Sequence, residues 1–288
     1  MFKIAILGCE NSHAKSFLAP IRDGLYPELE VVGVYSNEPE AAAAIHEEFG
    51  VHVMERYDEL VGQLDGLIVT ARHGDNHYRY AKPYLASGIP MFIDKPFTCL
   101  EEDGEALMRE AKANGVKLCG GSICALLPET QALAAAVKDG TVGALRGGAV
   151  SCPIYMDSPY GGFFFYAQHL VDIMTAVFGE DVRAIRAERT EGGVHLIARY
   201  DGYCVSGTYG EAQPFYSISV YGEKATDTKC LNITAECFRR EVDDLLELLH
   251  GAEMAKSYES FLLPVYLLNA TVRSLESGAW ESVHTFSK

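Results

Sequence analysis

Short β-rich runs alternate with longer helical patterns from residue 2 to about residue 122, and this alternation constrains the fold more than any other feature of the chain. It is typical of βαβ units, whose strands form a parallel sheet. The expected strands are residues 3–7, 29–35, 66–70, 90–93 and 117–120. We therefore expect residues 1–122 to form a doubly wound α/β domain.

Residues 123–288 show a different pattern, in which runs of β-branched and aromatic residues are separated by turns. The turn Tyr200-Asp201-Gly202-Tyr203 predicts a β-hairpin. The expected strands are residues 144–151, 182–190, 194–200, 203–209, 216–221 and 227–231, and the expected helices are residues 164–178, 236–250 and 257–277. This second domain is therefore expected to be α+β, with an open, predominantly antiparallel sheet. Its last helix could pack back on the first domain.

The composition favours a protein that binds a small molecule. Forty acidic against 24 basic residues give a formal charge of −16, with no cluster of Lys or Arg, which argues against nucleic acid or an anionic membrane as a partner. No segment approaches the about 20 apolar residues of a membrane helix, and the N-terminus shows no secretory pattern. The eight cysteines form no Cys-x-x-Cys pair, so we expect reduced thiols in a cytoplasmic protein.

The segment Asp94-Lys95-Pro96-Phe97 directly follows a short apolar run and places a lysine at the carboxyl end of an expected parallel strand. In an open α/β sheet that edge binds ligands, and Lys95 could polarise a carbonyl or transfer a proton there. In the second domain, His169 and Asp172 lie at i and i+3 of an expected helix. His169 could act as a general acid or base, and Asp172 could orient the imidazole or a ligand.

The first strand is followed by Gly8-Cys9-Glu10-Asn11-Ser12-His13, where a dinucleotide fold carries its Gly-x-Gly-x-x-Gly turn. Glu10 stands where the second glycine normally lets the backbone approach the pyrophosphate. A carboxylate about 5 Å from a phosphate would cost roughly 3 kcal/mol at an effective dielectric near 20. The helix N-terminus still attracts anions, Ser12 can cap it and His13 can contribute a donor. The segment is thus either a modified phosphate site or a structural turn.

The loop after the second strand is expected at the same edge of the sheet. Ser36 and Asn37 follow the second strand, where an acidic residue usually receives the ribose hydroxyls. They could accommodate a hydroxyl or a 2′-phosphate. Asn37 could also cap the next helix, with Pro39 in its first turn and Glu40 completing a capping box.

The loop after the third strand is rich in ionisable side chains. Arg72 could hold a phosphate or carboxylate, and His73 or His77 could bind a ligand or cap the next helix. His73, Asp75 and His77 fit no standard zinc spacing, so we expect no metal.

The order of these features resembles the Gfo/Idh/MocA family of oxidoreductases, which includes glucose-fructose oxidoreductase and inositol dehydrogenase. The resemblance rests on the turn from Gly8, on Ile93-Asp94-Lys95-Pro96-Phe97, which matches the family's Glu-Lys-Pro element, and on Gly161-Gly162 followed by His169-Leu170-Val171-Asp172. Residues 262–278 also resemble the family's last helix. The likeness extends over essentially the whole chain.

The resemblance implies an N-terminal Rossmann domain, a C-terminal domain with an open sheet, and a bound NAD or NADP. It implies hydride transfer between nicotinamide and a secondary hydroxyl or carbonyl of a sugar, cyclitol or related polyol, with Lys95, His169 and Asp172 as catalytic residues. Homodimers or homotetramers are expected to form through the open sheet. The candidate cofactor-binding residues are Gly8, Glu10, Asn11, Ser12, His13, Ser36, Asn37, Thr70, Ala71, Arg72, His73, His77, Asp94 and Lys95.

The chain also departs from the family pattern. Asp94 replaces a glutamate, Glu10 and His13 replace glycines, and an aspartate expected shortly before His169 is absent. Two alternatives therefore stand beside a dehydrogenase: a non-catalytic ligand-binding or regulatory protein, and a lyase or glycosidase that uses NAD transiently. The candidate substrate contacts are Tyr155, Asp157, Tyr160 and Tyr166, the last of which could replace the missing aspartate.

Overall fold

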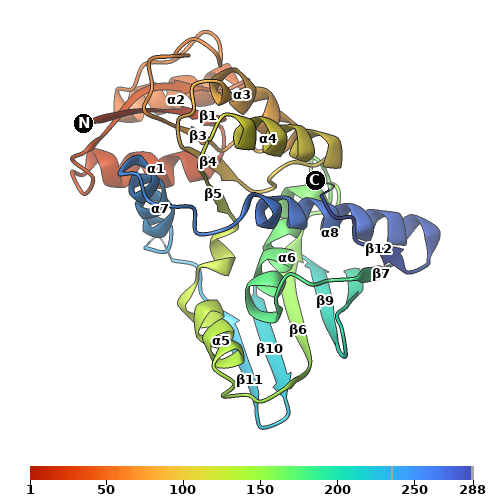
Figure 1. Ribbon diagram of the computed structural model, residues 1–288. Helices are drawn as coiled ribbons and strands as arrows, with labels where there is room; N and C mark the ends of the chain where they lie inside the picture. Colours follow the sequence, from red (N-terminus) through yellow and green to blue (C-terminus); the bar gives the residue numbers. More distant parts are fainter. Residues whose placement is uncertain (235, 287–288) are drawn as a thin grey trace. The chain divides into compact units, whose positions relative to one another are not determined.

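The computed structural model describes residues 1–234 and 236–286, and the chain folds into two compact units (Figure 1). The first unit contains Met1–Gly121 and Thr234–Phe261, and the second contains Ser122–Ile233 and Leu262–Lys288. The sequence predicts a second domain of residues 123–288, whose last helix could pack back on the first domain. The structure groups the segment Thr234–Phe261 with the first unit instead.

A five-stranded parallel sheet forms the centre of the first unit, as expected. Its strand order is β2-β1-β3-β4-β5. The strands are β1 (Phe2–Leu7), β2 (Leu29–Tyr35), β3 (Gly66–Val69), β4 (Met91–Asp94) and β5 (Leu118–Gly121). Because the chain moves from β2 across β1 to β3, the topological switch point lies at the carboxyl ends of β1 and β3. Ligands of open α/β sheets bind at such a point.

Helices cover both faces of this sheet, so the unit is doubly wound (Figure 1). One face packs against apolar side chains of α1, α2 and α7, including Phe17, Ile45 and Leu245. On the other face α3 and α4 pack against each other. The helices are α1 (Ser12–Arg22), α2 (Pro39–Phe49), α3 (Asp75–Leu85), α4 (Glu101–Ala113) and α7 (Arg239–Leu249).

Two helix caps differ from the predictions. Asn11, not Ser12, caps α1, because the Asn11 side chain accepts a hydrogen bond from the His13 N–H. The cap of α2 is Glu38, not Asn37, and it makes no side-chain capping bond. The prediction of a capping box was therefore wrong, although Pro39 does occupy the first turn.

The second unit is built on a seven-stranded sheet with the order β11-β10-β6-β9-β8-β7-β12. Only β6 and β9 pair in parallel among these described strands, so the sheet is predominantly antiparallel, as predicted. The predicted hairpin joins β8 and β9. The strands are β6 (Leu145–Ile154), β7 (Ala184–Thr190), β8 (Gly193–Arg199), β9 (Cys204–Glu211), β10 (Tyr216–Gly222), β11 (Thr226–Leu231) and β12 (Glu281–Ser282).

Helix α6 (Phe164–Phe178) covers one face of this sheet and begins and ends where the sequence predicts. Leu196 and Ala198 of β8 are buried on that face, whereas Ile197 and Arg199 point to the exposed face. A short 3₁₀ helix (Ile123–Ala125), α5 (Pro128–Lys138) and α8 (Tyr258–Ser277) are the remaining helices described, and the boundary between the units falls within α8.

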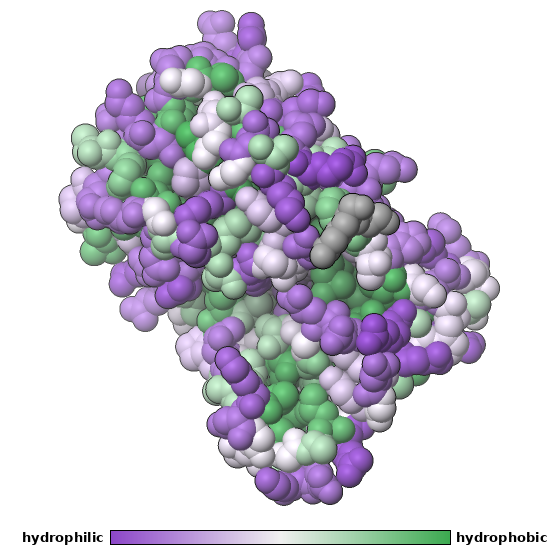
Figure 2. Space-filling view, viewed as in Figure 1, coloured by the Kyte–Doolittle hydropathy of each residue, from purple (hydrophilic) through white to green (hydrophobic). Residues whose placement is uncertain are grey.

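Hydrophilic side chains cover most of the face shown in Figure 2, with smaller hydrophobic patches between them. This distribution agrees with 40 acidic and 24 basic residues in the chain. Among the described residues, no helix has the length and apolar character needed to cross a membrane.

Candidate functional site

The turn after β1 brings three loops of the first unit together. Gly8 has a φ of +89°, and a Cβ placed on it would lie 2.2 Å from the Ala71 nitrogen, so only glycine fits. The Gly8 and Cys9 N–H groups both donate to the Tyr35 carbonyl at the end of β2. Thr70 Oγ1 donates to the Gly8 carbonyl over 3.1 Å. The ends of β1, β2 and β3 are thus tied to one another at the switch point.

Glu10 is buried between these loops, with 6% of its surface exposed. Its Oε2 accepts a hydrogen bond from the Ser36 hydroxyl over 2.8 Å, and its Oε1 accepts one from the Arg72 N–H over 3.1 Å. The guanidinium of Arg72 lies 3.6 Å from a carboxylate oxygen of Glu38. The carboxylate that breaks the glycine motif therefore connects the loops after β2 and β3.

Asp94, the last residue of β4, is fully buried and anchors the neighbouring polar groups. Its Oδ1 accepts the Lys95 N–H over 2.7 Å, and its Oδ2 lies 3.3 Å from Asn11 Nδ2 and 2.7 Å from His13 Nδ1. Burial alone would raise the pKa of Asp94, but His13, Lys95 and these contacts outweigh it and lower the pKa. Lys95 itself is buried, with 4% of its surface exposed.

The remaining candidate cofactor residues are divided between the interior and the surface. His77 is fully buried, with Nε2 2.8 Å from the Ala71 carbonyl, and burial lowers its pKa, so it holds its own loop as a neutral imidazole. Asn37 and Ser12 are exposed. His73 instead groups with Asp75 and Cys99, with ligand atoms within 4.8 Å of one another. Burial and the Asp75 carboxylate raise the pKa of the Cys99 thiol, which disfavours the thiolate that a metal would need.

Glu241 of α7 is a carboxyl group that the sequence analysis did not identify. It is 2% exposed, and neither carboxyl oxygen has a hydrogen-bond partner among the described residues. Burial raises its pKa, Asp94 raises it further, and Lys95 acts in the opposite direction. Burial therefore favours the protonated form of Glu241 in the folded protein.

In the second unit, His169 and Asp172 are both held by Ser122, a residue that the motif search missed. Ser122 Oγ lies 2.6 Å from His169 Nδ1, and the Ser122 N–H donates to Asp172 Oδ2 over 2.8 Å. Asp172 Oδ2 also accepts a hydrogen bond from Gln168 Nε2 over 3.1 Å. His169 and Asp172 are 3% and 4% exposed, so this network is buried. Ser122 directly follows β5, so the strand-end rule that located Lys95 would also have found it.

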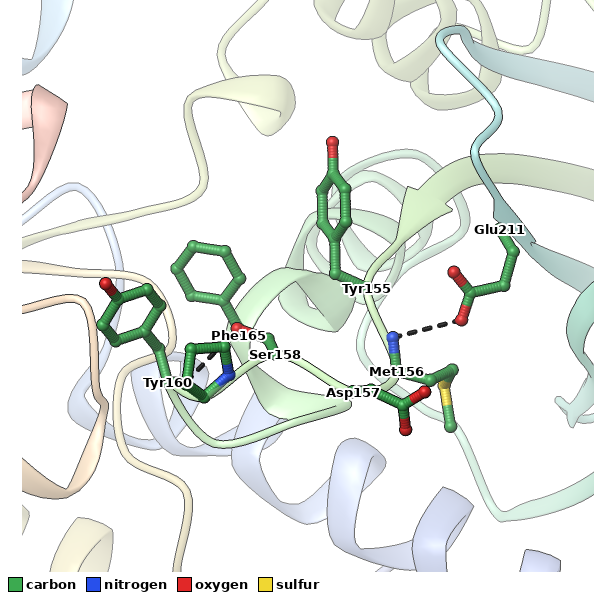
Figure 3. Close-up of a pocket in the computed structure, with 8 residues that line it drawn as sticks. Tyr155, Met156, Asp157, Ser158, Tyr160, Phe165 and Glu211 are labelled. Carbon is green, nitrogen blue, oxygen red and sulfur yellow. Dashed lines mark hydrogen bonds between the residues drawn. The ribbon is translucent and has the colours of Figure 1, made fainter.

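Aromatic rings connect His169 to a pocket of about 350 Å³ in the same unit. The His169 ring lies 4.7 Å from the Tyr166 ring, which lies 4.9 Å from the Tyr155 ring. Tyr155 lines the pocket, and Figure 3 shows its ring between Phe165 and the Glu211 carboxylate. The lining residues are Tyr155, Met156, Asp157, Ser158, Pro159, Tyr160, Phe165 and Glu211.

These eight residues include two carboxylates and no Lys, Arg or His. Glu211 Oε1 accepts the Met156 N–H over 3.2 Å (Figure 3). Three of the four candidate substrate residues, Tyr155, Asp157 and Tyr160, line the pocket, and Tyr166 contacts it through Tyr155.

The family of the first unit follows from comparison with known proteins. Residues 2–122 match the family GFO_IDH_MocA, described as an oxidoreductase family with an NAD-binding Rossmann fold. The match covers the parallel sheet of the first unit and does not extend to the second sheet. The oxidoreductase YhhX of Escherichia coli (strain K12) is 32% identical over 80 residues, which are 27% of this chain and 23% of YhhX. The resemblance found in the sequence motifs is thereby confirmed.

Solved structures of dehydrogenases match almost the whole chain in fold. The myo-inositol dehydrogenase of Corynebacterium glutamicum ATCC 13032 has a TM-score of 0.84 at 16% identity, over 99% of this chain and 100% of that protein. The WlbA dehydrogenase of Bordetella pertussis, in complex with NADH and UDP-GlcNAcA, has a TM-score of 0.83 at 18% identity, over 99% of both chains. The expected pairing of a Rossmann unit with a largely antiparallel sheet is thereby confirmed.

The polar groups at the switch point fit the NAD-binding character of the Gfo/Idh/MocA family. The N-terminus of α1 offers backbone N–H groups suited to a pyrophosphate, and Glu10 offers carboxylate oxygens that can accept hydrogen bonds from hydroxyl groups. The Glu10 carboxylate is held in place by the Ser36 hydroxyl and the Arg72 N–H.

Proposed function

We propose that this protein is a dehydrogenase that uses NAD or NADP and acts on a secondary hydroxyl, or the matching carbonyl, of a sugar, cyclitol or related polyol. The observation that carries the proposal is His169, held through Nδ1 by Ser122 beside an aromatic pocket. The first unit supports it, since residues 2–122 match an oxidoreductase family with an NAD-binding fold.

His169 is the proposed acid or base. To take a proton from a substrate hydroxyl, Nε2 must be unprotonated, so Nδ1 must carry the hydrogen and donate it to Ser122 Oγ. Ser122 Oγ also accepts the Cys124 N–H over 3.1 Å, which fixes the hydroxyl in place. Asp172 would act through Ser122, whose N–H it accepts, and is therefore a positioning residue.

Lys95 is the proposed electrostatic partner of the reaction. Its backbone N–H is anchored to Asp94 at the end of β4, and its side chain is buried. A buried ammonium can stabilise negative charge that develops on a reacting oxygen. The nicotinamide, when bound, supplies or accepts the hydride.

The pocket beside Tyr155 is the proposed substrate site. The faces of Tyr155, Tyr160 and Phe165 can pack against the C–H face of a sugar or cyclitol ring, and Asp157 and Glu211 can accept hydrogen bonds from its hydroxyls. Because no basic side chain lines the pocket, neutral polyols are favoured over phosphorylated or acidic ones.

The test combines nucleotide binding with turnover. Thermal unfolding with NAD, NADH, NADP and NADPH identifies the cofactor, because a ligand at 100 times its dissociation constant adds about 2.7 kcal/mol of stability. Neutral polyols are then screened with that cofactor. Substituting His169→Ala or Lys95→Ala should each lower kcat by roughly 100-fold or more. The exposed His52→Ala and Lys112→Ala serve as matched controls, and full turnover by either site variant would refute its assigned role.

A second candidate function is ligand binding without redox turnover. Glu10 favours it, because the residue replaces the second glycine of the phosphate turn. If no nucleotide raises the unfolding midpoint and none co-purifies, this function becomes the better one.

We also propose that the exposed face of the second sheet forms a homodimer or homotetramer contact. Ile197 and Tyr221 on this face are 43% and 42% exposed. Sedimentation of the wild type and of Ile197→Glu tests this proposal, since the substitution should shift the protein towards monomer.

A further inference from the structure

We propose that Glu10 makes the cofactor site selective for NAD over NADP, by receiving the adenosine ribose hydroxyls in place of the acidic residue that usually follows β2. This inference rests on the proposed dinucleotide site. In dinucleotide folds, the acid after the second strand binds the ribose 2′-hydroxyl. Here β2 ends at Tyr35, and Ser36 and Asn37 follow it without a carboxylate.

The structure brings a carboxylate to that strand end from a different loop. Glu10 belongs to the turn between β1 and α1, yet its Oε2 is 2.8 Å from Ser36 Oγ. The side chain is fixed there, because Oε1 accepts the Arg72 N–H and only 6% of the residue is exposed. The carboxylate thus comes from the turn after β1 instead of the loop after β2, at the same edge of the sheet.

The remaining hydrogen-bonding capacity of Glu10 suits a ribose and not a phosphate. A carboxylate has about four acceptor sites, and Ser36 and Arg72 fill one on each oxygen. The open acceptor sites can take hydrogens from the neighbouring 2′- and 3′-hydroxyls of NAD. The 2′-phosphate of NADP would place negative charge next to the Glu10 carboxylate and offers no hydroxyl hydrogen at that position. Glu10 would therefore repel it.

The neighbouring charges do not reverse this preference. Sites that accept NADP usually place an arginine near the 2′-phosphate. Arg72 is the cation on the adjacent loop, but its guanidinium faces Glu38 at 3.6 Å. Of these three side chains, the two carboxylates of Glu10 and Glu38 outnumber the one guanidinium of Arg72.

The test is isothermal titration of the full chain with NAD, NADP, ADP-ribose and 2′-phospho-ADP-ribose. The last two probes isolate the adenosine half of the site. The wild type should bind NAD at least about 30-fold more tightly than NADP, and the two ADP-riboses should differ similarly. Glu10→Gln should reduce both affinity ratios, NAD over NADP and ADP-ribose over 2′-phospho-ADP-ribose, at least about tenfold. The main cause should be tighter binding of the phosphorylated ligand. The control Glu40→Gln removes an exposed carboxylate of α2 and should leave the ratios unchanged.

Equal or tighter binding of NADP by the wild type would overturn the inference while leaving the dinucleotide site intact. An unchanged ratio in Glu10→Gln would do the same. If Glu10→Gln does not fold, Ser36→Ala replaces it in the test. Ser36→Ala keeps the negative charge of Glu10, so a loss of the preference for NAD in this variant would contradict the role of Glu10. Absence of binding by all four ligands would instead refute the proposed function itself.

Discussion

Replacing Asp94 with Asn should destabilise the first unit. Asp94 presents Oδ1 to the Lys95 N–H at 2.7 Å and Oδ2 to Asn11 Nδ2 at 3.3 Å, with His13 Nδ1 2.7 Å from Oδ2. Asparagine has the same shape, but one of its two positions is an NH₂ group. Whichever way the amide is turned, a donor then faces another donor, and the negative charge is lost.

The cost can be bounded from the burial of Asp94. A hydrogen bond to a charged group contributes about 1.5–3 kcal/mol, and breaking a buried charge pair by removing one partner costs roughly 3–5 kcal/mol. We therefore expect Asp94→Asn to lower the free energy of unfolding by about 3 kcal/mol at pH 7. That change lowers Tm by roughly 6–12 °C for a unit of this size. Urea unfolding without nucleotide, followed by circular dichroism, measures it.

The pH dependence gives an independent test of the same reasoning. The folded pKa of Asp94 is lower than its unfolded value. Its stabilisation is therefore complete above the unfolded pKa of about 3.9 and is lost as the pH falls through the folded pKa. The difference between wild type and Asp94→Asn should shrink below about pH 4. Exposed Asp23→Asn is the matched control. A loss under about 1 kcal/mol at pH 7, or a difference at pH 3 as large as that at pH 7, would refute the argument.

Three further predictions concern the buried groups and the pocket. Ser122→Ala should lower kcat/KM about tenfold or more and shift its pH profile, because His169 Nδ1 loses its 2.6 Å contact with Ser122 Oγ and keeps the longer one to Cys124 Sγ at 3.6 Å. Ser122→Thr should restore the profile, and an unaltered profile would show a merely structural hydroxyl. Glu241→Gln should raise the free energy of unfolding at pH 8 by at least about 1 kcal/mol and have little effect near pH 4. The folded pKa of Glu241 is raised above the unfolded value of 4.5, so the contribution of Glu241 to the free energy of unfolding falls as the pH rises above 4.5. Equal stabilisation by Glu241→Gln at both pH values would contradict this sign. Tyr155→Ala should raise KM for the polyol severalfold and change kcat less, because Tyr155 lines the proposed substrate pocket. Steady-state kinetics measures both, and a larger effect on kcat than on KM would contradict the prediction.

The strands and the long helices could be predicted because each carries its own pattern. Residues 164–178 contain an apolar helical pattern that begins after Gly161-Gly162 and ends before Gly179, and α6 has these bounds. The helix caps could not be predicted as well, because Ser36, Asn37 and Glu38 compete for one helix start. Ser36 Oγ accepts the Glu38 N–H over 2.9 Å, which leaves Asn37 without the role that its side chain suggested.

The assignment of α7 to a unit needed information that local sequence does not contain. Its apolar stripe, which includes Val242, Leu245 and Leu248, predicts a helix with one buried face. The stripe does not specify which surface it covers. These side chains complete the core on one face of the parallel sheet, although they follow the second sheet in the chain.

The candidate site could be located but not assembled from the sequence. The strand-end rule placed Lys95, Glu10 and Arg72 at the edge where ligands bind. The network of Ser122 and His169 joins residues 47 positions apart, and no spacing rule connects them. Such contacts depend on how α6 packs against the 3₁₀ helix Ile123–Ala125, which follows Ser122.

Glu10 shows why a departure from a motif has to be judged by its partners. Taken alone, a carboxylate in the phosphate turn predicts repulsion of the cofactor. In the structure it is buried with a hydroxyl and a backbone N–H directed at its two oxygens, and a buried carboxylate is tolerated only with such donors. Those donors come from the loops after β2 and β3, so the substitution at position 10 is coupled to Ser36 and to the backbone at Arg72. A glycine there would restore the motif but leave both donors without their acceptor, which is a cost that the motif does not reveal.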